Sequence, residues 1–410
     1  MLAPEPFLEP RGTPFSVYHR ARALSRLGHE IDLVTYPQGA SVTLPNVHTY
    51  RVWRVPFIRR VKIGPSLAKL PLDALLFARA AGLLARRRYD CIHTHEEAGL
   101  FGAIFSRVFG LPHVHDMHSD LAEQMTNFRV PGGALLAVLA RTVERIMLRS
   151  ARIVIVICPE LRDTVAALAP GKPVVLIENT AVAGEEAEET ERAPASGELD
   201  RRLAELRREL ALDVVEQGTE GAGPIFVYTG TFESYQGLEL VVESMPAVLE
   251  RFPSAVYVLV GGRPEQARRL AELGRRLGVE RALRLPGQRP PGEMPLFLAL
   301  ADVLLSPRSQ GTNTPLKIYS YLHAGKPILA TAIRSHTQVL SPDVAVLVAP
   351  TSAGLAGGAL RLLAGAGLRE QLARNAQTLA DERYSYTTFL SRTESVYRQV
   401  RPQPAFAMRR

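Results

Sequence analysis

The sequence predicts an α/β protein with two doubly wound units, each a mostly parallel sheet covered by helices. Short apolar runs that suit buried strands alternate with longer segments of helical periodicity along most of the 410 residues. A segment rich in Glu, Ala and Gly at 184–223 interrupts this alternation, which then begins again. Two such units joined by a linker place a cleft between them at the carboxyl ends of their strands.

The first half of the chain contains the elements of one unit. The expected helices cover residues 15–27 (ended by Gly28), 67–87, 99–109 and 132–149. The expected strands are residues 30–35, 89–93, 112–116, 152–157 and 174–177. Residues 1–6 are typical of the end of an earlier strand, so we expect the true start of this unit to lie upstream.

The second half repeats the pattern after the interruption, which itself contains a short helical piece at 199–210. The expected strands are residues 225–229, 255–260, 282–285, 302–306 and 327–330. The expected helices are residues 238–251, 264–277, 294–301, a helix that begins at Pro315 and stops at Gly325, and a final helix at 386–400.

Composition excludes several classes of protein. The chain is long enough for two domains, and no apolar stretch reaches the roughly 18 residues that span a bilayer. No signal peptide is recognisable at the N-terminus. The two cysteines, Cys91 and Cys158, form neither a disulfide framework nor a zinc site, and both lie in strand-like runs as buried thiols. We therefore expect a cytoplasmic protein.

The net charge of +8 is unevenly distributed along the chain. Residues 51–90 contain ten Lys or Arg residues against Asp73 and Asp90, interleaved with apolar side chains such as Phe57 and Leu70. This mixture suits an anionic membrane surface, and it equally suits an amphipathic helix with a solvated basic face. A nucleic-acid partner is not expected, because the segment has few aromatic residues and matches no nucleic-acid-binding module.

Residues 305–330 indicate a phosphorylated ligand. A buried strand leads into the polar loop 310–314, and Thr314 is suitably placed to cap a helix whose first residue is Pro315. The free N–H groups of a helix start beside Thr, Asn and Lys side chains suit a phosphate group.

This stretch resembles the donor-site loop and helix of retaining GT-B glycosyltransferases, in particular the large family 4, or group 1, type. The resemblance spans most of the chain. It implies that residues 1–183 form a Rossmann-like acceptor domain and residues 224–375 a Rossmann-like nucleotide-sugar donor domain, facing across a cleft. Residues 184–223 would be the linker, and a helix within 376–410 would cross back to the first domain. The resemblance calls for no cofactor and no metal ion.

Two N-terminal pieces resemble family motifs. In the loop at 9–15, Gly12 would allow close backbone approach and Thr13 would offer a donor, although the same residues suit a plain turn before a helix. His118, just after an expected strand, resembles the family histidine that approaches the transferred sugar. His115 and Asp116 are alternative candidates for this role. Without a functional role, His118 would be a surface histidine in a polar loop. His93, His95, Glu96 and Glu97 lie nearby in sequence, but no spacing matches a known metal site.

The C-terminal motifs depart from the family pattern. The family segment has an arginine and a lysine that grip the diphosphate. Thr231 stands near the arginine position and Gln236 takes the lysine position, although Gly230 and Gly237 remain. The two family glutamates fall on Thr312 and Ser320. We infer that Arg308 and Lys317 replace the missing cations, and that Thr312, Asn313 and Thr314 present N–H or hydroxyl groups to the donor. Lys317 and Ser320 would share a helix face.

The leading hypothesis is a retaining glycosyltransferase that moves a sugar from a nucleotide-diphosphate sugar to a lipid-linked or polysaccharide acceptor in cell-envelope glycan synthesis. One alternative is a non-catalytic nucleotide-sugar-binding or scaffold protein of a polysaccharide assembly complex, which the missing carboxylates and cations favour. Another is a GT-B nucleotide-sugar epimerase, for which no pair of acidic groups is evident. The absence of a Gly-x-Gly-x-x-Gly turn between a strand and a helix argues against a Rossmann dehydrogenase.

Overall fold

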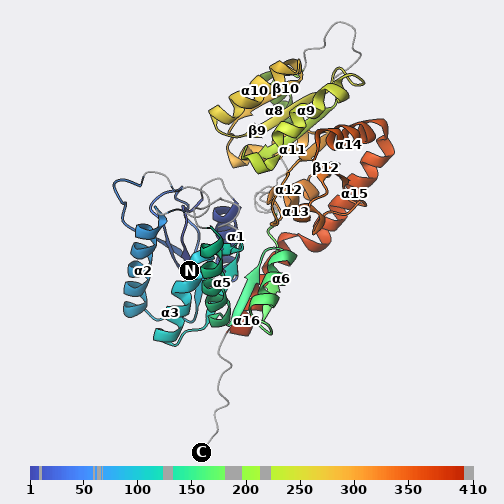
Figure 1. The fold of residues 1–410 in the computed structure, drawn as a ribbon. Helices are drawn as coiled ribbons and strands as arrows, with labels where there is room; N and C mark the ends of the chain where they lie inside the picture. The colour runs from blue at the N-terminus through green and yellow to red at the C-terminus, as the bar shows by residue number, and fades with distance from the viewer. Residues whose placement is uncertain are drawn as a thin grey trace, which may run out of the picture. The chain divides into compact units, whose positions relative to one another are not determined.

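The computed structural model describes residues 1–8, 12–58, 61, 66, 68–122, 133–180, 196–212 and 223–400. The chain divides into two compact units (Figure 1). The first contains residues 1–179 together with the chain from Thr387 onward, and the second contains Thr180–Tyr386. Each unit is built on a parallel sheet, which confirms the predicted fold class.

The described residues of the first unit contain a seven-stranded parallel sheet with the order β3-β2-β1-β4-β5-β6-β7. Its strands are β1 Leu2–Ala3, β2 Ile31–Thr35, β3 Val47–Arg51, β4 Ile92–His95, β5 His113–Met117, β6 Ile153–Val156 and β7 Val174–Leu176. Strand order reverses beside β1, the position at which open α/β sheets bind ligands. Strand β3 is not among the expected elements, because its residues are half-buried or exposed and lack an apolar run.

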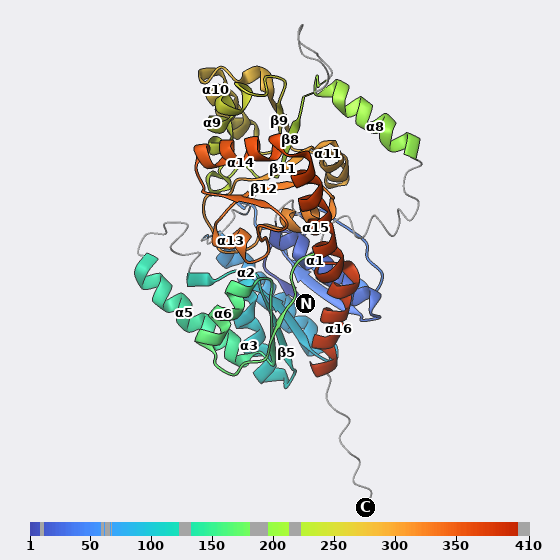
Figure 2. The ribbon, with the colours of Figure 1, turned by 90° about the vertical axis from the view of Figure 1, so that its right-hand side faces the viewer.

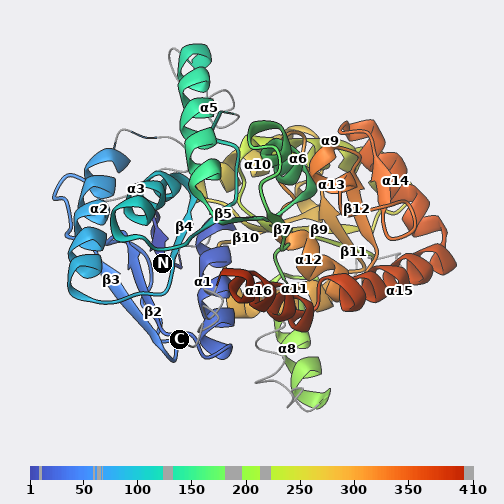
Figure 3. The same cartoon turned by 90° about the horizontal axis from the view of Figure 1, so that it is seen from below.

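Helices cover both faces of this sheet (Figure 3). On one face lie α2 Lys69–Arg86, α3 Gly99–Phe109 and α5 Gly133–Ser150, with α3 in contact with both α2 and α5. On the other lie α1 Gly12–Arg26 and α16 Tyr386–Val400. Helix α6 Pro159–Leu168 follows β6 and was not predicted.

The described residues of the second unit contain a six-stranded parallel sheet with the order β10-β9-β8-β11-β12-β13. The strands are β8 Ile225–Gly230, β9 Val256–Gly261, β10 Leu283–Gly287, β11 Val303–Ser306, β12 Ile328–Thr331 and β13 Val346–Val348. Ile225 and Val227 enter the apolar core on one face of the sheet, and Phe226 and Tyr228 enter the core on the other. This alternation identifies β8 as a central strand that is buried on both sides.

The helices of the second unit are α8 Ser196–Glu209, α9 Leu238–Leu249, α10 Pro264–Arg276, α11 Met294–Leu300, α12 Lys317–His323, α13 Arg334–Thr337, α14 Ser352–Ala364 and α15 Ala366–Arg383. Helices α9 and α14 lie side by side (Figure 2). Helix α8 falls within the segment predicted to be a linker, and it contacts α11 and buries Leu206 in the core of the second unit. Residues 181–195 and 213–222 on either side of it are outside the described part.

No helix among the described residues is both long and apolar enough to cross a membrane.

Candidate active site

The carboxyl ends of β4 and β5 carry four ionisable side chains on one face of the first sheet. They are His93, His95, Asp116 and His118, and all four are buried. His95 Nδ1 lies 3.0 Å from His118 Nε2, which in turn lies 3.3 Å from Asp116 Oδ1. His93 Nε2 lies 3.6 Å from Asp116 Oδ2. The predicted site residue His118 therefore belongs to a buried polar cluster and not to an exposed loop.

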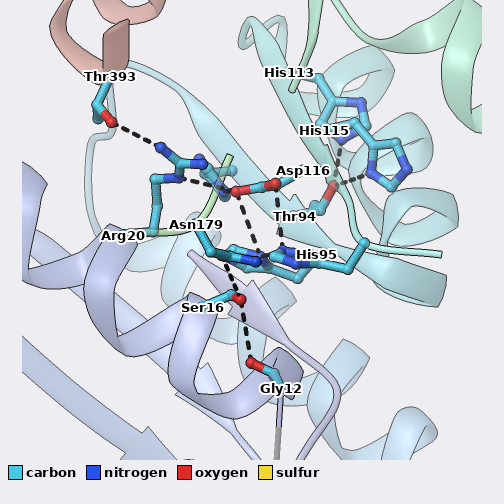
Figure 4. Close-up of polar contacts among 12 residues, drawn as sticks. Gly12, Ser16, Arg20, Thr94, His95, His113, His115, Asp116, Asn179 and Thr393 are labelled. Atoms are coloured by element: carbon cyan, nitrogen blue, oxygen red, sulfur yellow. Dashed lines mark hydrogen bonds and ion pairs between the residues drawn. The ribbon is translucent and has the colours of Figure 1, made fainter. Parts of the chain in front are cut away.

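Helix α1 supplies the countercharge for this cluster (Figure 4). Gly12, Ser16 and Arg20 recur every four residues and so share one face of the helix. Arg20 Nε donates to Asp116 Oδ2 at 3.0 Å, and Arg20 Nη1 donates to Thr393 Oγ1 of α16 at 2.7 Å. Sequence reasoning missed Arg20, although its position four residues after Ser16, and two such steps after Gly12, was a usable signal.

Two further contacts tie the cluster to its surroundings. Tyr397 of α16 lies with its hydroxyl 2.5 Å from His93 Nδ1. Nearer the start of α1, Ser16 Oγ donates to Asn179 Oδ1 at 2.7 Å (Figure 4). Helix α16 is thus joined through hydrogen bonds to the strand ends that carry the cluster.

The charges of the cluster follow from burial and from the ion pair. Burial alone would raise the pKa of Asp116, but Arg20, with help from His118, His93 and His95, holds this pKa well below its usual range. Burial lowers the pKa of His118 against the opposing pull of Asp116, and it lowers the pKa of His93 to about 4. At neutral pH the cluster is an ionised Asp–Arg pair surrounded by neutral imidazoles, which donate or accept hydrogen bonds but carry no charge.

His115 lies on the opposite face of the sheet from His118. Its Nδ1 lies 3.2 Å from the hydroxyl of Thr94, which also lies 2.7 Å from His113 Nε2. Of the two alternatives to His118, the structure therefore brings Asp116 into the cluster and leaves His115 out of it. A one-residue step along a strand reverses the side chain's face, which explains the difference.

Three groups of the cluster also meet the spacing of a metal site. One ligand atom each of His93, His95 and Asp116 lies within 4.8 Å of the others. Arg20 already places a cation 3.0 Å from the same Asp116 oxygen that both histidines face. Positive charge at this position would repel a divalent ion, so the arrangement favours an ion pair over metal coordination.

Gly12 and Thr13 form the first turn of α1, and residues 9–11 of the predicted loop lie outside the described part. Gly12 is exposed and Thr13 is half-buried. A Cβ added to Gly12 would meet no atom of the described residues within 4 Å, so this part of the fold does not require glycine there.

A second cluster forms where β8 ends in the second unit. Lys317 Nζ donates to Gln236 Oε1 at 3.5 Å, and Gln236 Nε2 donates to Thr231 Oγ1 at 3.5 Å. Three predicted site residues from two separate segments are thus brought into one chain of contacts. The amine of Lys317 thus lies beside Gln236, the residue predicted to take the family lysine position.

Tyr228, which sequence reasoning did not select, contacts Lys317 through the face of its ring. The ammonium nitrogen lies 3.6 Å from the centroid of its ring, and the Tyr228 hydroxyl donates to the Thr231 carbonyl at 2.7 Å. Burial, and then the nearby Arg308, lower the pKa of Lys317 well below its usual range. Among the described residues, the lysine contacts an aromatic ring and an amide and no carboxylate, so a bound anion would be the first negative charge beside it.

Two glycines give this cluster its close-fitting backbone. Gly237 has a φ of 70°, and a Cβ there would collide with the Pro307 carbonyl oxygen. Gly230 has a φ of 142°, and a Cβ there would lie 3.6 Å from Lys317 Nζ. The backbone geometry therefore favours glycine at positions 230 and 237, whereas it does not at Gly12.

Arg308 holds the loop that precedes α12. Its Nε donates to the Gln310 carbonyl and its Nη1 to the Asn313 carbonyl, both at 2.7 Å. Gly311 has no Cβ, which allows the guanidinium to approach. The structure thus gives Arg308 a role in shaping the loop, besides the phosphate contact predicted for it.

The remaining predicted residues flank this loop. The Thr312 carbonyl accepts a hydrogen bond from Gln338 Nε2 at 2.7 Å, and the Asn313 carbonyl is taken by Arg308. Thr314 is buried and its hydroxyl has no hydrogen-bond partner among the described residues. Ser320 is half-buried on α12, one turn after Lys317.

The predicted start of this helix is wrong by two residues. Helix α12 begins at Lys317, and Thr314 does not cap it. Tight turns come first, in which the Ile318 N–H donates to the Pro315 carbonyl at 3.0 Å and the Tyr319 N–H donates to Leu316 at 3.3 Å. The predicted stop is correct, because Gly325 has a φ of 62° after the last helical residue.

Comparison with protein families gives two matches. Residues 11–180 match the glycosyl transferase 4-like domain, and residues 213–379 match the glycosyl transferases group 1 family. The chain is 25% identical over 338 residues to D-inositol 3-phosphate glycosyltransferase of Corynebacterium diphtheriae, covering 76% of this chain and 72% of that protein. It is 24% identical to the phosphatidyl-myo-inositol mannosyltransferase of Mycobacterium leprae, covering 98% of this chain and 96% of that protein.

Solved structures share the fold over nearly the whole chain. Sucrose-phosphate synthase from Thermosynechococcus elongatus superimposes with a TM-score of 0.75 at 20% identity, covering 97% of this chain and 98% of that one. Anabaena HepE in complex with UDP gives a TM-score of 0.71 at 16% identity, covering 97% and 99%. The matches to both halves and the two parallel-sheet units place the chain among the glycosyltransferases that join a glycosyl transferase 4-like domain to a group 1 domain and adopt the GT-B fold.

Proposed function

We propose that this glycosyltransferase takes a nucleotide-diphosphate sugar as donor and transfers the sugar with retention of anomeric configuration. The observation that carries the proposal is the position of Lys317, whose ammonium lies on the Tyr228 ring and beside Gln236. Once protonated beside a bound diphosphate, a lysine in this position supplies the positive charge that the leaving group requires, and its contacts among the described residues are an amide and an aromatic ring. UDP is present in the complex of the fold relative HepE, which supports a nucleotide donor.

The acceptor that we propose is a lipid-linked or polysaccharide glycan of the cell envelope, modified on the cytoplasmic side. Two relatives named above carry inositol phosphate or phosphatidyl-inositol in their names. Cys91 and Cys158 are both free thiols, in keeping with a reducing compartment. No metal ion or cofactor enters this proposal, because Lys317 provides charge at the leaving group and Arg20 already pairs with Asp116 in the candidate metal cluster found among the described residues.

His118 and Lys317 have separate roles in this proposal. Lys317 stabilises the negative charge that develops on the departing diphosphate. His118, held by His95 and Asp116, is a neutral hydrogen-bonding group for the transferred sugar. Retention needs no covalent nucleophile if the leaving phosphate guides the acceptor to the same face of the sugar.

A non-catalytic donor-binding protein is the second candidate, and a specific observation favours it. Thr312 and Ser320 stand at the positions of the two family carboxylates, and neither carries a charge. Such a protein would bind nucleotide sugar without consuming it.

The test is incubation of the purified protein with UDP-, GDP- and ADP-sugars, followed by measurement of released nucleotide and by NMR of the sugar's anomeric proton. Release of one nucleotide with the anomeric configuration kept supports the proposal. Inversion would overturn the retaining part, and a changed sugar stereocentre would indicate an epimerase. Selective binding without any release, with and without candidate acceptors, would identify the donor-binding alternative.

A further inference from the structure

The outer surface of α3 and α5 exposes aliphatic side chains that no described element covers. Val108 is 68% exposed, Val138 67% and Leu139 60%, and Ile104 and Ile146 are also exposed. We call these five residues the α3–α5 outer face. Isolated exposed hydrophobics are ordinary, but five on two helices in contact with each other form a patch.

The exposed residues of α3 and α5 lie on the same side of the first unit. Gly99 and Gly102 of α3 pack against His115 and His113 of the sheet, and Met147 of α5 is buried beside Gly99. Both helices therefore rest on the same side of the sheet, and their opposite faces point to solvent together (Figure 3). On α5, positions 138, 139 and 146 fall within one arc of a helix with 3.6 residues per turn.

The exposed charged side chains of α3 and α5 are positive. Arg107 of α3 and Arg145 and Arg149 of α5 are exposed. Among the described side chains of α2, α3 and α5, the acidic residues are Asp73 and Glu144. Asp73 accepts a hydrogen bond from the Tyr36 hydroxyl at 2.5 Å, and Glu144, which is 1% exposed, accepts one from the Leu121 N–H at 3.1 Å. Both carboxylates are thus turned away from the outer surface, leaving it basic and apolar.

We propose that the α3–α5 outer face binds an anionic lipid bilayer. Aliphatic side chains that enter the acyl boundary, with arginines at the level of the headgroups, are the combination that holds a helix at a membrane surface. A second copy of the chain fits less well, since a two-fold contact would place these arginines opposite one another. Nucleic acid would require aromatic side chains for stacking, and the face has aliphatic ones.

This surface differs from the one expected at residues 51–90. Most apolar residues of α2 are used by the core, where Leu72, Leu76 and Ala80 are buried. Trp53 and Phe57 are exposed, at 82% and 95%, and lie in the chain before α2. The membrane surface is therefore assigned to α3 and α5, with the basic residues of α2 beside it.

The location suits an enzyme whose acceptor is in a membrane. A helix that follows a parallel strand begins at the carboxyl edge of the sheet, the edge that carries His118. Val138 and Leu139 lie in the first half of α5 and so close to that edge. Lipid binding is measured without donor or acceptor, so its result is independent of the proposed transfer reaction.

The test is co-sedimentation of the full chain with vesicles of phosphatidylcholine alone and of phosphatidylcholine mixed with phosphatidylglycerol. We expect binding to the mixed vesicles, a loss of tenfold or more with Val138→Ser/Leu139→Ser, and a similar loss with Arg145→Glu/Arg149→Glu. The matched control, Leu199→Ser/Leu277→Ser, removes two exposed leucines of the second unit and leaves binding unchanged. Circular dichroism verifies that each variant is folded.

A fluorescence experiment locates the contact. Trp53 is the single tryptophan of the chain. In a Trp53→Phe background, Val138→Trp is expected to shift its emission to the blue and to be quenched by brominated lipid, whereas Leu277→Trp is not.

Three results would overturn the assignment. One is absence of binding to both vesicle types, and another is binding that survives the α5 substitutions but is lost with Trp53→Phe/Phe57→Ser. The third is concentration-dependent self-association that Val138→Ser/Leu139→Ser abolishes, which would make the face a contact between copies.

Discussion

Lys317 lies with its ammonium nitrogen 3.6 Å from the centroid of the Tyr228 ring, at the end of the first strand of the group 1 domain. The contact joins a residue of a short helix to a residue of the central strand β8, and Gln236 extends it toward Thr231. Thr231 and Gln236 are the residues predicted to stand where the family has an arginine and a lysine, and the contact places the amine of Lys317 next to Gln236.

Replacing Lys317 should weaken donor binding. We expect Lys317→Ala to reduce UDP affinity by about 1–3 kcal/mol, because a charge-assisted contact to the diphosphate is lost. Calorimetric titration measures the change. Tyr228→Phe, which keeps the ring but loses the hydroxyl contact to Thr231, is the matched control and should change the affinity much less. Equal affinity of Lys317→Ala and the wild type would remove the lysine from the site.

Donor binding should also take up a proton. Burial lowers the pKa of Lys317 in the free protein, and an adjacent diphosphate favours the charged form. UDP affinity is therefore expected to fall as pH rises through the lowered pKa. Titration in buffers with different ionisation enthalpies counts the protons bound. Lys317→Arg stays charged and should bind without proton uptake; uptake that persists in this variant would point to another group.

Breaking the Arg20–Asp116 pair should destabilise the first unit. Arg20→Ala leaves a buried carboxylate without its cation and is expected to cost about 3–5 kcal/mol in the free energy of unfolding. Arg20→Ala/Asp116→Ala should cost less than the sum of the single changes, since it removes both charges. Urea unfolding of the four proteins gives the coupling energy. Additive single effects would mean that the ion pair contributes nothing.

Acid should remove the stability that His115 contributes. Burial lowers the pKa of His115 from 6.5 to about 4, so the unfolded chain binds the proton first as pH falls. The free energy of unfolding therefore carries the full His115 contribution above pH 6.5. It loses this contribution progressively between pH 6.5 and pH 4 and changes no further, on account of His115, below pH 4. The cost of His115→Asn in the free energy of unfolding should therefore shrink by about 1–2 kcal/mol between pH 7.5 and pH 5. A cost independent of pH would contradict a neutral buried histidine.

Gly237 and Gly12 provide a matched pair. Gly237→Ala should lower stability by more than ~2 kcal/mol, because a Cβ meets the Pro307 carbonyl in a left-handed backbone conformation. Gly12→Ala should leave the free energy of unfolding unchanged, since its Cβ would meet no atom. Any loss of transfer rate in a stable Gly12→Ala protein would then report the approach of a substrate. A destabilised Gly12→Ala would contradict the geometry of α1.

Transfer should survive a chelator. Arg20 supplies the positive charge beside Asp116, and in the proposed function Lys317 provides positive charge for the diphosphate. We expect the same rate of nucleotide release with and without EDTA, measured after dialysis. A rate lost with EDTA and restored by a divalent ion would point to His93, His95 and Asp116 as ligands.

Local patterns in the sequence predicted most strands and helices correctly. The run at β8 and the left-handed Gly325 follow from apolar periodicity and from helix-stop chemistry, which act over a few residues. Strand β3 and the start of α12 escaped prediction. The first lacks an apolar run, and the second is preceded by tight turns that a capping pattern does not distinguish from a helix.

The sequence by itself determined the alternating α/β architecture, the family resemblance and the list of candidate residues, including the missing charges at Thr231, Gln236, Thr312 and Ser320. Only the tertiary structure decided which of these residues meet. Lys317 and Gln236 are 81 positions apart, and Arg20 and Asp116 are 96 apart. Such contacts depend on strand order and on the face each side chain takes, and neither is encoded in local periodicity.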